Sequence, residues 1–145
     1  MGLYNFKPQF VPFILDGTKT HTIRGERKHI DMPGRTMHLY TGLRHKGAQL
    51  LMRVRCVKVE FVRIETDYRV RIGSRIDSEN PDDIGGAGVP GGFIELDQAE
   101  KNALAWRDGF RPPGDPEQAF NLMMEFWRGR LPFEGHIYHW KPGKR

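Results

Sequence analysis

Eight residues near the amino terminus, from Gly17 to Arg24, bring together side chains that can do chemistry. Lys19 supplies an amine and Thr22 a hydroxyl. The imidazole of His21 lies between them, and the guanidinium of Arg24 follows. A threonine hydroxyl attacks a carbonyl only beside a base, and a lysine acts as that base only when burial or nearby cations lower its pKa. The same groups could also hold a phosphate or form a solvated basic edge, and the residues alone leave these interpretations open.

The elements on either side must position these groups. The apolar pattern between Pro8 and Asp16 predicts a short helix, which Gly17 ends in the left-handed conformation. The alternating β-branched residues that follow predict a strand with Thr22 and Arg24 on one face and His21 on the other. A strand that starts at a helix end can carry its first side chains into a cleft.

The stretch from Leu50 to Ile64 is the clearest strand signal in the chain. Apolar residues hold the even positions as far as Cys56 and the odd positions from Val57 onward. Because successive side chains of a strand point to opposite faces, this change of parity predicts a β-bulge or a sharp bend near these two residues. Further strands are predicted at 37–40, 68–72 and 135–140, and a loop rich in glycine and proline at 77–92.

Two helices are predicted in the carboxy-terminal half. Asp97 and Glu100 form a capping box, and the helix that follows ends at Gly109. Asp115 begins a second helix, which Gly129 ends. The aromatic residues Trp106, Phe126 and Trp127 recur at helical spacing, which favours a place in the core over a platform for stacking bases.

Composition narrows the class of protein. The 145 residues include 23 Lys and Arg against 18 Asp and Glu, so the formal net charge is +5 and polyanionic or phosphate-bearing partners are favoured. The lone cysteine, Cys56, excludes an intrachain disulfide and argues against a cysteine-rich metal site. No apolar run reaches the roughly 20 residues of a membrane-spanning helix, and no secretory leader is recognisable, so a cytoplasmic location is expected.

The combined pattern resembles the ASCH family. Its pieces are G-x-K-x-x-T-x-R at 17–24, Trp-Arg-Asp-Gly-Phe at 106–110, Phe-Trp at 126–127 and the closing strand at 133–140. The resemblance implies an α+β fold, a small PUA-like mixed or antiparallel β-barrel with flanking helices. It covers one domain, residues 1–145, with a glycine- and proline-rich insertion at about 67–95.

Small bacterial members of this family are amidohydrolases that remove the acetyl group of N(4)-acetylcytidine. By position, the resemblance implies that Lys19 is the proton acceptor, Thr22 the nucleophile and Asp108 the proton donor. The family has a glutamate where this chain has Asp108, one methylene shorter, and enzymes lose rate steeply when a reacting group is misplaced by about 1 Å. Amide hydrolysis of this type needs no metal and no cofactor. A structural alternative is that Lys19 and Arg24 bind phosphate while Asp108 neutralises one of them.

Other side chains are candidates for contacts with an RNA, a nucleoside or a nucleotide. They are His21, Arg24, Tyr40, Arg44 and Lys46. A non-catalytic RNA-binding module and a ribonuclease that uses His21 with Lys19 are the alternative functions. His136 and His139 are three residues apart, a spacing that does not share a strand face, so no zinc site is predicted. Nothing in the sequence indicates an obligate protein partner.

Overall fold

The computed structural model describes residues 2–25, 31–43, 46–77 and 93–141. The elements, in chain order, are β1 (Gly2–Phe6), the 3-10 turn η1 (Pro8–Phe10), α1 (Val11–Leu15), β2 (His21–Gly25), β3 (Thr36–Thr41), β4 (Gln49–Ile64), β5 (Val70–Asp77), β6 (Phe93–Glu95), α2 (Gln98–Asp108), the 3-10 turn η2 (Pro116–Gln118), α3 (Ala119–Phe126) and β7 (Phe133–Trp140). The predicted α+β class is confirmed, since a seven-stranded sheet is combined with helices.

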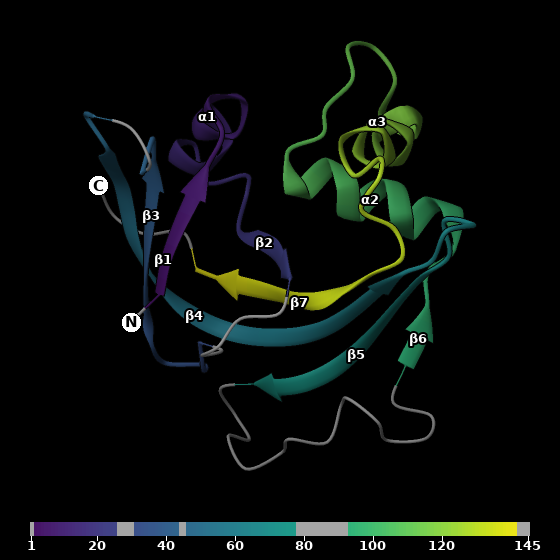
Figure 1. The fold of residues 1–145 in the computed structure, drawn as a ribbon, viewed down its shortest axis with the longest axis horizontal. Coiled ribbons are helices and arrows are strands. Elements are labelled where there is room, and N and C mark those ends of the chain that lie inside the picture. The colour runs from purple at the N-terminus through teal and green to yellow at the C-terminus, as the bar shows by residue number, and fades with distance from the viewer. Residues whose placement is uncertain (1, 26–30, 44–45, 78–92, 142–145) are drawn as a thin grey trace.

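The sheet is built around the long strand β4. Its first half pairs with β3, and β1 then adds in parallel on the far side of β3. Its second half pairs with β5 on one side and β7 on the other, while β2 extends the sheet beyond β7 and β6 beyond β5, all antiparallel. The strands curve strongly, and α1, α2 and α3 all lie over the same side of them (Figure 1).

The predicted bend in β4 is confirmed. The register against β7 shifts between Cys56, which pairs with Trp140, and Lys58, which pairs with His139. Val57 is therefore the extra residue of a β-bulge. Because β4 pairs with β3 before this point and with β5 and β7 after it, the bulge marks the passage from one half of the sheet to the other.

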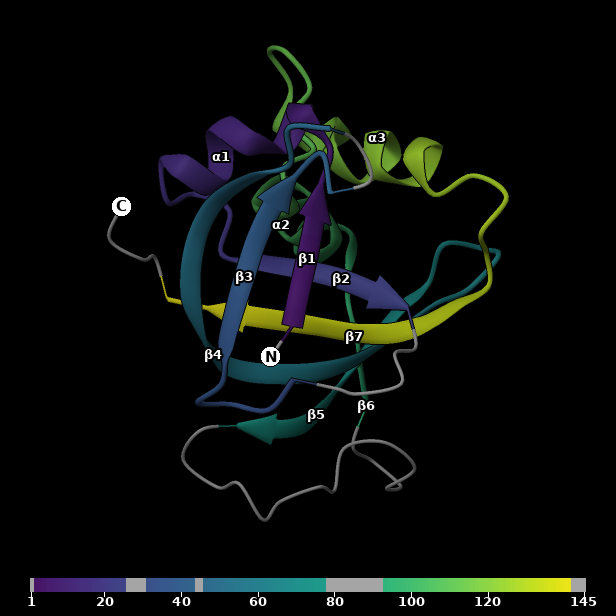
Figure 2. The ribbon, with the colours of Figure 1, turned by 60° about the vertical axis from the view of Figure 1, so that its left-hand side comes forward.

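The sheet does not close, so the predicted β-barrel is wrong in this respect. Within the described residues, β1, β2 and β6 each pair with one strand only. Figure 2 shows β1 and β3 crossing β2 and β7 steeply. Neighbouring strands of a sheet differ in direction by only about 20–25°, so β1 cannot continue the hydrogen-bond ladder of β2.

Several elements differ from their predicted bounds. β1 was not predicted, and the strand expected at 68–72 begins at Val70 and runs to Asp77. The helix expected from Asp115 to Gly129 is the turn η2 followed by the shorter helix α3, although the Asp115 side chain does accept from the backbone N–H of Glu117. The capping box and the end of α2 are as predicted. Residues 78–92 of the predicted loop lie outside the described residues.

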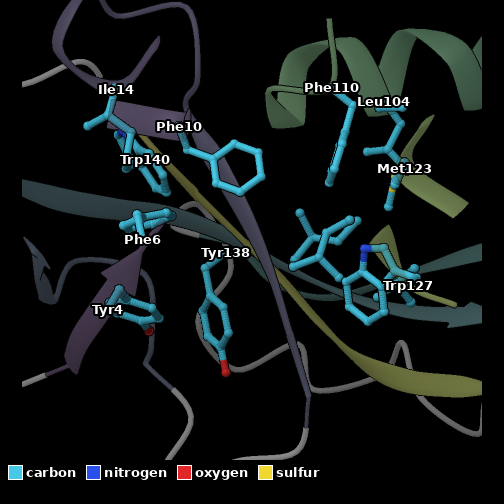
Figure 3. Close-up of a cluster of buried hydrophobic side chains, with 14 of the residues drawn as sticks. Tyr4, Phe6, Phe10, Ile14, Leu104, Phe110, Met123, Trp127, Tyr138 and Trp140 are labelled. Carbon is cyan, nitrogen blue, oxygen red and sulfur yellow. The ribbon is translucent and has the colours of Figure 1, made fainter. Parts of the chain in front are cut away.

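One cluster of buried apolar side chains joins the sheet to the helices. Tyr4, Phe6, Tyr138 and Trp140 enter it from β1 and β7, and Leu104, Phe110 and Met123 enter it from the region of α2 and α3 (Figure 3). The ring centroids of Phe10 and Phe110 lie 5.4 Å apart where the two groups meet. Lys19 lies beside this junction, with its Nζ 5.2 Å from the centre of the Phe10 ring.

Candidate functional site

A tight turn after α1 directs Lys19 inward. Gly17 has a φ of 83°, as predicted for the residue that ends the helix. The backbone N–H of Lys19 donates to the Phe13 carbonyl oxygen at 2.8 Å, and the Thr18 hydroxyl lies 2.6 Å from a carboxylate oxygen of Asp16. These bonds hold the connection between α1 and β2 in a compact form, and Lys19 is buried.

The last turn of α2 brings Asp108 to the same place. The helix begins at Asp97, whose side chain accepts from the backbone N–H of Glu100 at 2.8 Å, and ends at Gly109 with a φ of 108°. Gly109 packs so closely that a Cβ built on it would lie 2.6 Å from Cδ1 of Phe10. The absence of a side chain at Gly109 therefore lets the end of α2 meet η1, and Asp108 is buried at this contact.

Lys19 and Asp108 form a buried ion pair, with side chains only 3% and 9% exposed. The Lys19 amine donates to the carboxylate oxygen Oδ1 of Asp108 at 2.8 Å and to its main-chain oxygen at 2.6 Å. His21 is the first residue of β2, and its Nε2 lies 3.2 Å from the same Oδ1. The sequence prediction that Lys19 and Asp108 meet in space is confirmed.

Burial and proximity change how these groups titrate. Burial lowers the pKa of Lys19, because a desolvated ammonium is costly, and this outweighs the attraction of Asp108. Burial also lowers the pKa of His21. For Asp108, burial alone would raise the pKa of the carboxyl, but the adjacent Lys19 and His21 hold that pKa below its usual range. The arrangement therefore favours an ionised Asp108 beside a lysine that gives up its proton unusually easily.

The pair lies at the wall of a cavity of about 440 Å³. Lys19, Thr22, Arg24 and Asp108 supply polar groups to its lining, with Asn5, Lys7 and Arg130. The rest of the wall is mainly aromatic and consists of Phe6, Phe10, Phe110, Phe126, Trp127 and Phe133, with Ile23 and Gly25. Figure 3 shows four of these rings, those of Phe6, Phe10, Phe110 and Trp127, entering from different elements. A cavity with aromatic walls and a few polar groups suits a planar organic ligand.

Thr22 lines this cavity but bonds a different partner. Its hydroxyl oxygen accepts from Nε of Arg24 at 3.0 Å, and Nη2 of Arg24 donates to the Asn5 carbonyl oxygen at 2.8 Å. No hydrogen bond joins Thr22 to Lys19 or Asp108 in the part of the chain that the structure describes. The three residues therefore share one cavity without forming one hydrogen-bonded triad.

The other predicted contact residues lie elsewhere. Tyr40 is half-buried on β3, and Lys46 is exposed in the connection between β3 and β4. Neither lines the cavity, and Arg44 lies outside the described residues. His139, for which no zinc site was predicted, pairs with Glu60: its Nε2 lies 2.6 Å from the carboxylate oxygen Oε1.

Sequence reasoning missed part of the lining. Asn5, Phe6 and Lys7 reach the cavity because β1 pairs with β3. The local signal for this strand in the sequence is weak and consists of two aromatic residues at alternate positions, Tyr4 and Phe6. Trp127 was predicted to be a core residue. It is buried, but it also lines the cavity.

No protein family, curated protein or solved structure matches this chain. Among the described residues, no group of three or more His, Cys, Asp or Glu side chains is placed to hold a metal ion. None of the described helices combines the length and apolar character needed to cross a membrane.

Proposed function

We propose that the chain is a PUA-like protein of the ASCH type, with an incompletely closed sheet, that hydrolyses the amide of an N-acylated cytidine. The observation that carries this proposal is the buried pair of Lys19 and Asp108 in the same cavity as Thr22, a cavity with largely aromatic walls. A buried lysine whose pKa is lowered is the base that a threonine nucleophile requires. The aromatic rings offer faces on which a nucleobase can stack.

Lys19 is the proton carrier in this proposal. A neutral amine has two N–H groups and one lone pair, and the main-chain and carboxylate oxygens of Asp108 accept both N–H groups. The lone pair then remains for the proton of the Thr22 hydroxyl. Arg24 already donates to the oxygen of that hydroxyl, so the hydroxyl proton is available and negative charge that develops on the oxygen is stabilised. Ligand binding must bring Thr22 and Lys19 within hydrogen-bond reach, as often happens only in the substrate complex.

The Thr22 oxygen attacks the acyl carbon while Lys19 takes the hydroxyl proton. The bond from carbon to nitrogen then breaks, the proton on Lys19 passes to the leaving cytosine nitrogen, and water hydrolyses the acyl ester on Thr22. Asp108 orients Lys19 and stays ionised, because a carboxyl whose pKa is lowered is a poor proton donor near neutral pH. This assigns to Lys19 the donor role that the family resemblance implies for Asp108.

The test is release of acetate from N(4)-acetylcytidine by the purified chain. We expect Lys19→Met and Thr22→Val to lose at least about 100-fold in rate, since each removes a group that moves a proton or attacks the carbonyl. The control variants Lys101→Met and Thr36→Val change the same residue types away from the cavity and should keep the wild-type rate. Circular dichroism spectra establish that each variant is folded. Equal rates in all five proteins would refute the assignment.

A non-catalytic binding module is the second candidate, and the bond between Thr22 and Arg24 favours it. In that case the Thr22 hydroxyl is an acceptor that orients Arg24, and the cavity holds a nucleoside or an RNA nucleotide without reaction. Binding of N(4)-acetylcytidine with no release of acetate would select this candidate.

A further inference from the structure

Two cations from distant parts of the chain stand at the mouth of the cavity. Lys7 follows β1, and Arg130 lies in the connection between α3 and β7. Nζ of Lys7 is 4.8 Å from the centre of the Phe126 ring, and Cζ of Arg130 is 5.7 Å from the same centre. Both residues line the cavity, and both are exposed to solvent. The fold thus places two positive charges close to one aromatic ring of the wall.

These two cations are not neutralised within the described part of the chain. Neither Lys7 nor Arg130 forms an ion pair there. Asp108 is the one carboxylate among the described lining residues, and its Oδ1 accepts from Lys19 rather than from either cation. The mouth therefore carries an excess of positive charge, and a neutral ligand would form no ion pair with Lys7 or Arg130.

We propose that the cavity takes its ligand as a nucleotide, with the base against the aromatic wall and a phosphate between Lys7 and Arg130. The inference rests on the proposed function and names its substrate class. A free nucleoside would use the wall alone, whereas a nucleotide also uses the cations. Guanidinium and ammonium groups are strong partners for phosphate oxygens. The phosphate can belong to a free mononucleotide or to an RNA chain, which presents the same chemistry.

Calorimetric titration tests this, with the Thr22→Val chain as the common background so that the ligands stay intact. The ligands are N(4)-acetylcytidine, its 5′- and 3′-monophosphates, and a dinucleotide that contains the acetylated base. We expect at least one phosphorylated ligand to bind about tenfold more tightly than the nucleoside, and this advantage to shrink at high salt. When Lys7→Gln and Arg130→Gln are added to the Thr22→Val chain, the phosphorylated ligand should no longer bind more tightly than the nucleoside. The affinity for the nucleoside itself should stay within about twofold.

Arg128→Gln is the matched control, because it removes a charge two residues from Arg130 on a side chain that does not line the cavity. This variant should keep the full preference for phosphate. Nucleoside and nucleotides that bind equally well would overturn the inference and leave the proposed function standing, whereas binding of none of the ligands would overturn both. A dinucleotide that binds more tightly than either monophosphate would identify RNA as the source, and equal binding would identify the free nucleotide.

Discussion

At the scale of single residues, the site depends on three titratable side chains that are almost excluded from water. Lys19, His21 and Asp108 are each less than a tenth exposed, and all three meet at one carboxylate oxygen. Removing one member of a buried pair leaves the other uncompensated, which is why such groups are sensitive to substitution. Their common burial also makes folding depend on pH.

His21 gives this dependence a definite sign. Burial lowers its pKa in the folded chain, so below about pH 6.5 the unfolded chain binds a proton that the folded chain does not. The free energy of unfolding should therefore fall as the pH drops from 7.5 to 5.5, by at most about 1.4 kcal/mol per pH unit from this group. Urea titrations at several pH values measure the slope, which His21→Gln should reduce. His38→Gln controls for loss of a histidine elsewhere, and parallel curves for wild type and His21→Gln would show that the account is wrong.

At the scale of elements, the meeting of α2 with η1 positions Asp108 against Lys19, and Gly109 makes that meeting possible. We expect Gly109→Ala to cost about 1–2 kcal/mol for the left-handed backbone and a further 1–3 kcal/mol because its Cβ would overlap the Phe10 ring. Gly129→Ala is the matched control, since Gly129 is also left-handed but has no atom within 4 Å of the added Cβ. Urea denaturation of both variants measures the difference, and equal losses would mean that the close approach does not matter.

The sequence revealed best those elements whose ends carry local signals. The capping box of α2, the glycines that end α1 and α2 and the bulge at Val57 were all predicted, because each depends on a few adjacent residues. β1 was not predicted, since a five-residue strand is recognisable mainly by its parallel partner β3, about thirty residues later. Openness of the sheet also escaped prediction, because it depends on the crossing angle of distant strands.

The candidate site was also predicted only in part. Lys19, Thr22 and Asp108 were singled out from residue type and family resemblance, and the structure brings them to one cavity. The partners of Thr22 and the cations at the mouth were not predicted, because Lys7 and Arg130 reach the cavity only through the packing of β1 and of the chain after α3.

At the scale of the whole molecule, β4 makes the two halves of the sheet one structure. It pairs with β3 before the bulge and with β5 and β7 after it, and a single apolar cluster lies beneath both halves. The cavity is lined from β1, β2, α2 and the chain beside α3, so it exists only when all of these are in place. We therefore expect the described elements to unfold together, in one cooperative transition.

Cys56 reports on that transition, because it lies at the bulge that joins the two halves. Its backbone bonds Gly34 and Arg35, its side chain has no exposed surface, and burial raises the pKa of its thiol to about 11. Labelling by a disulfide reagent at pH 8 should be at least about 1,000-fold slower in the folded than in the unfolded chain. In increasing urea, the labelled fraction should rise at the same midpoint as the loss of circular dichroism, because Cys56 becomes accessible only when the whole sheet opens. Labelling at a clearly lower urea concentration would instead mean that the β3 side of the sheet opens on its own, and that the cavity, which β1 helps to line, can be lost while β2, β7 and the helices remain folded.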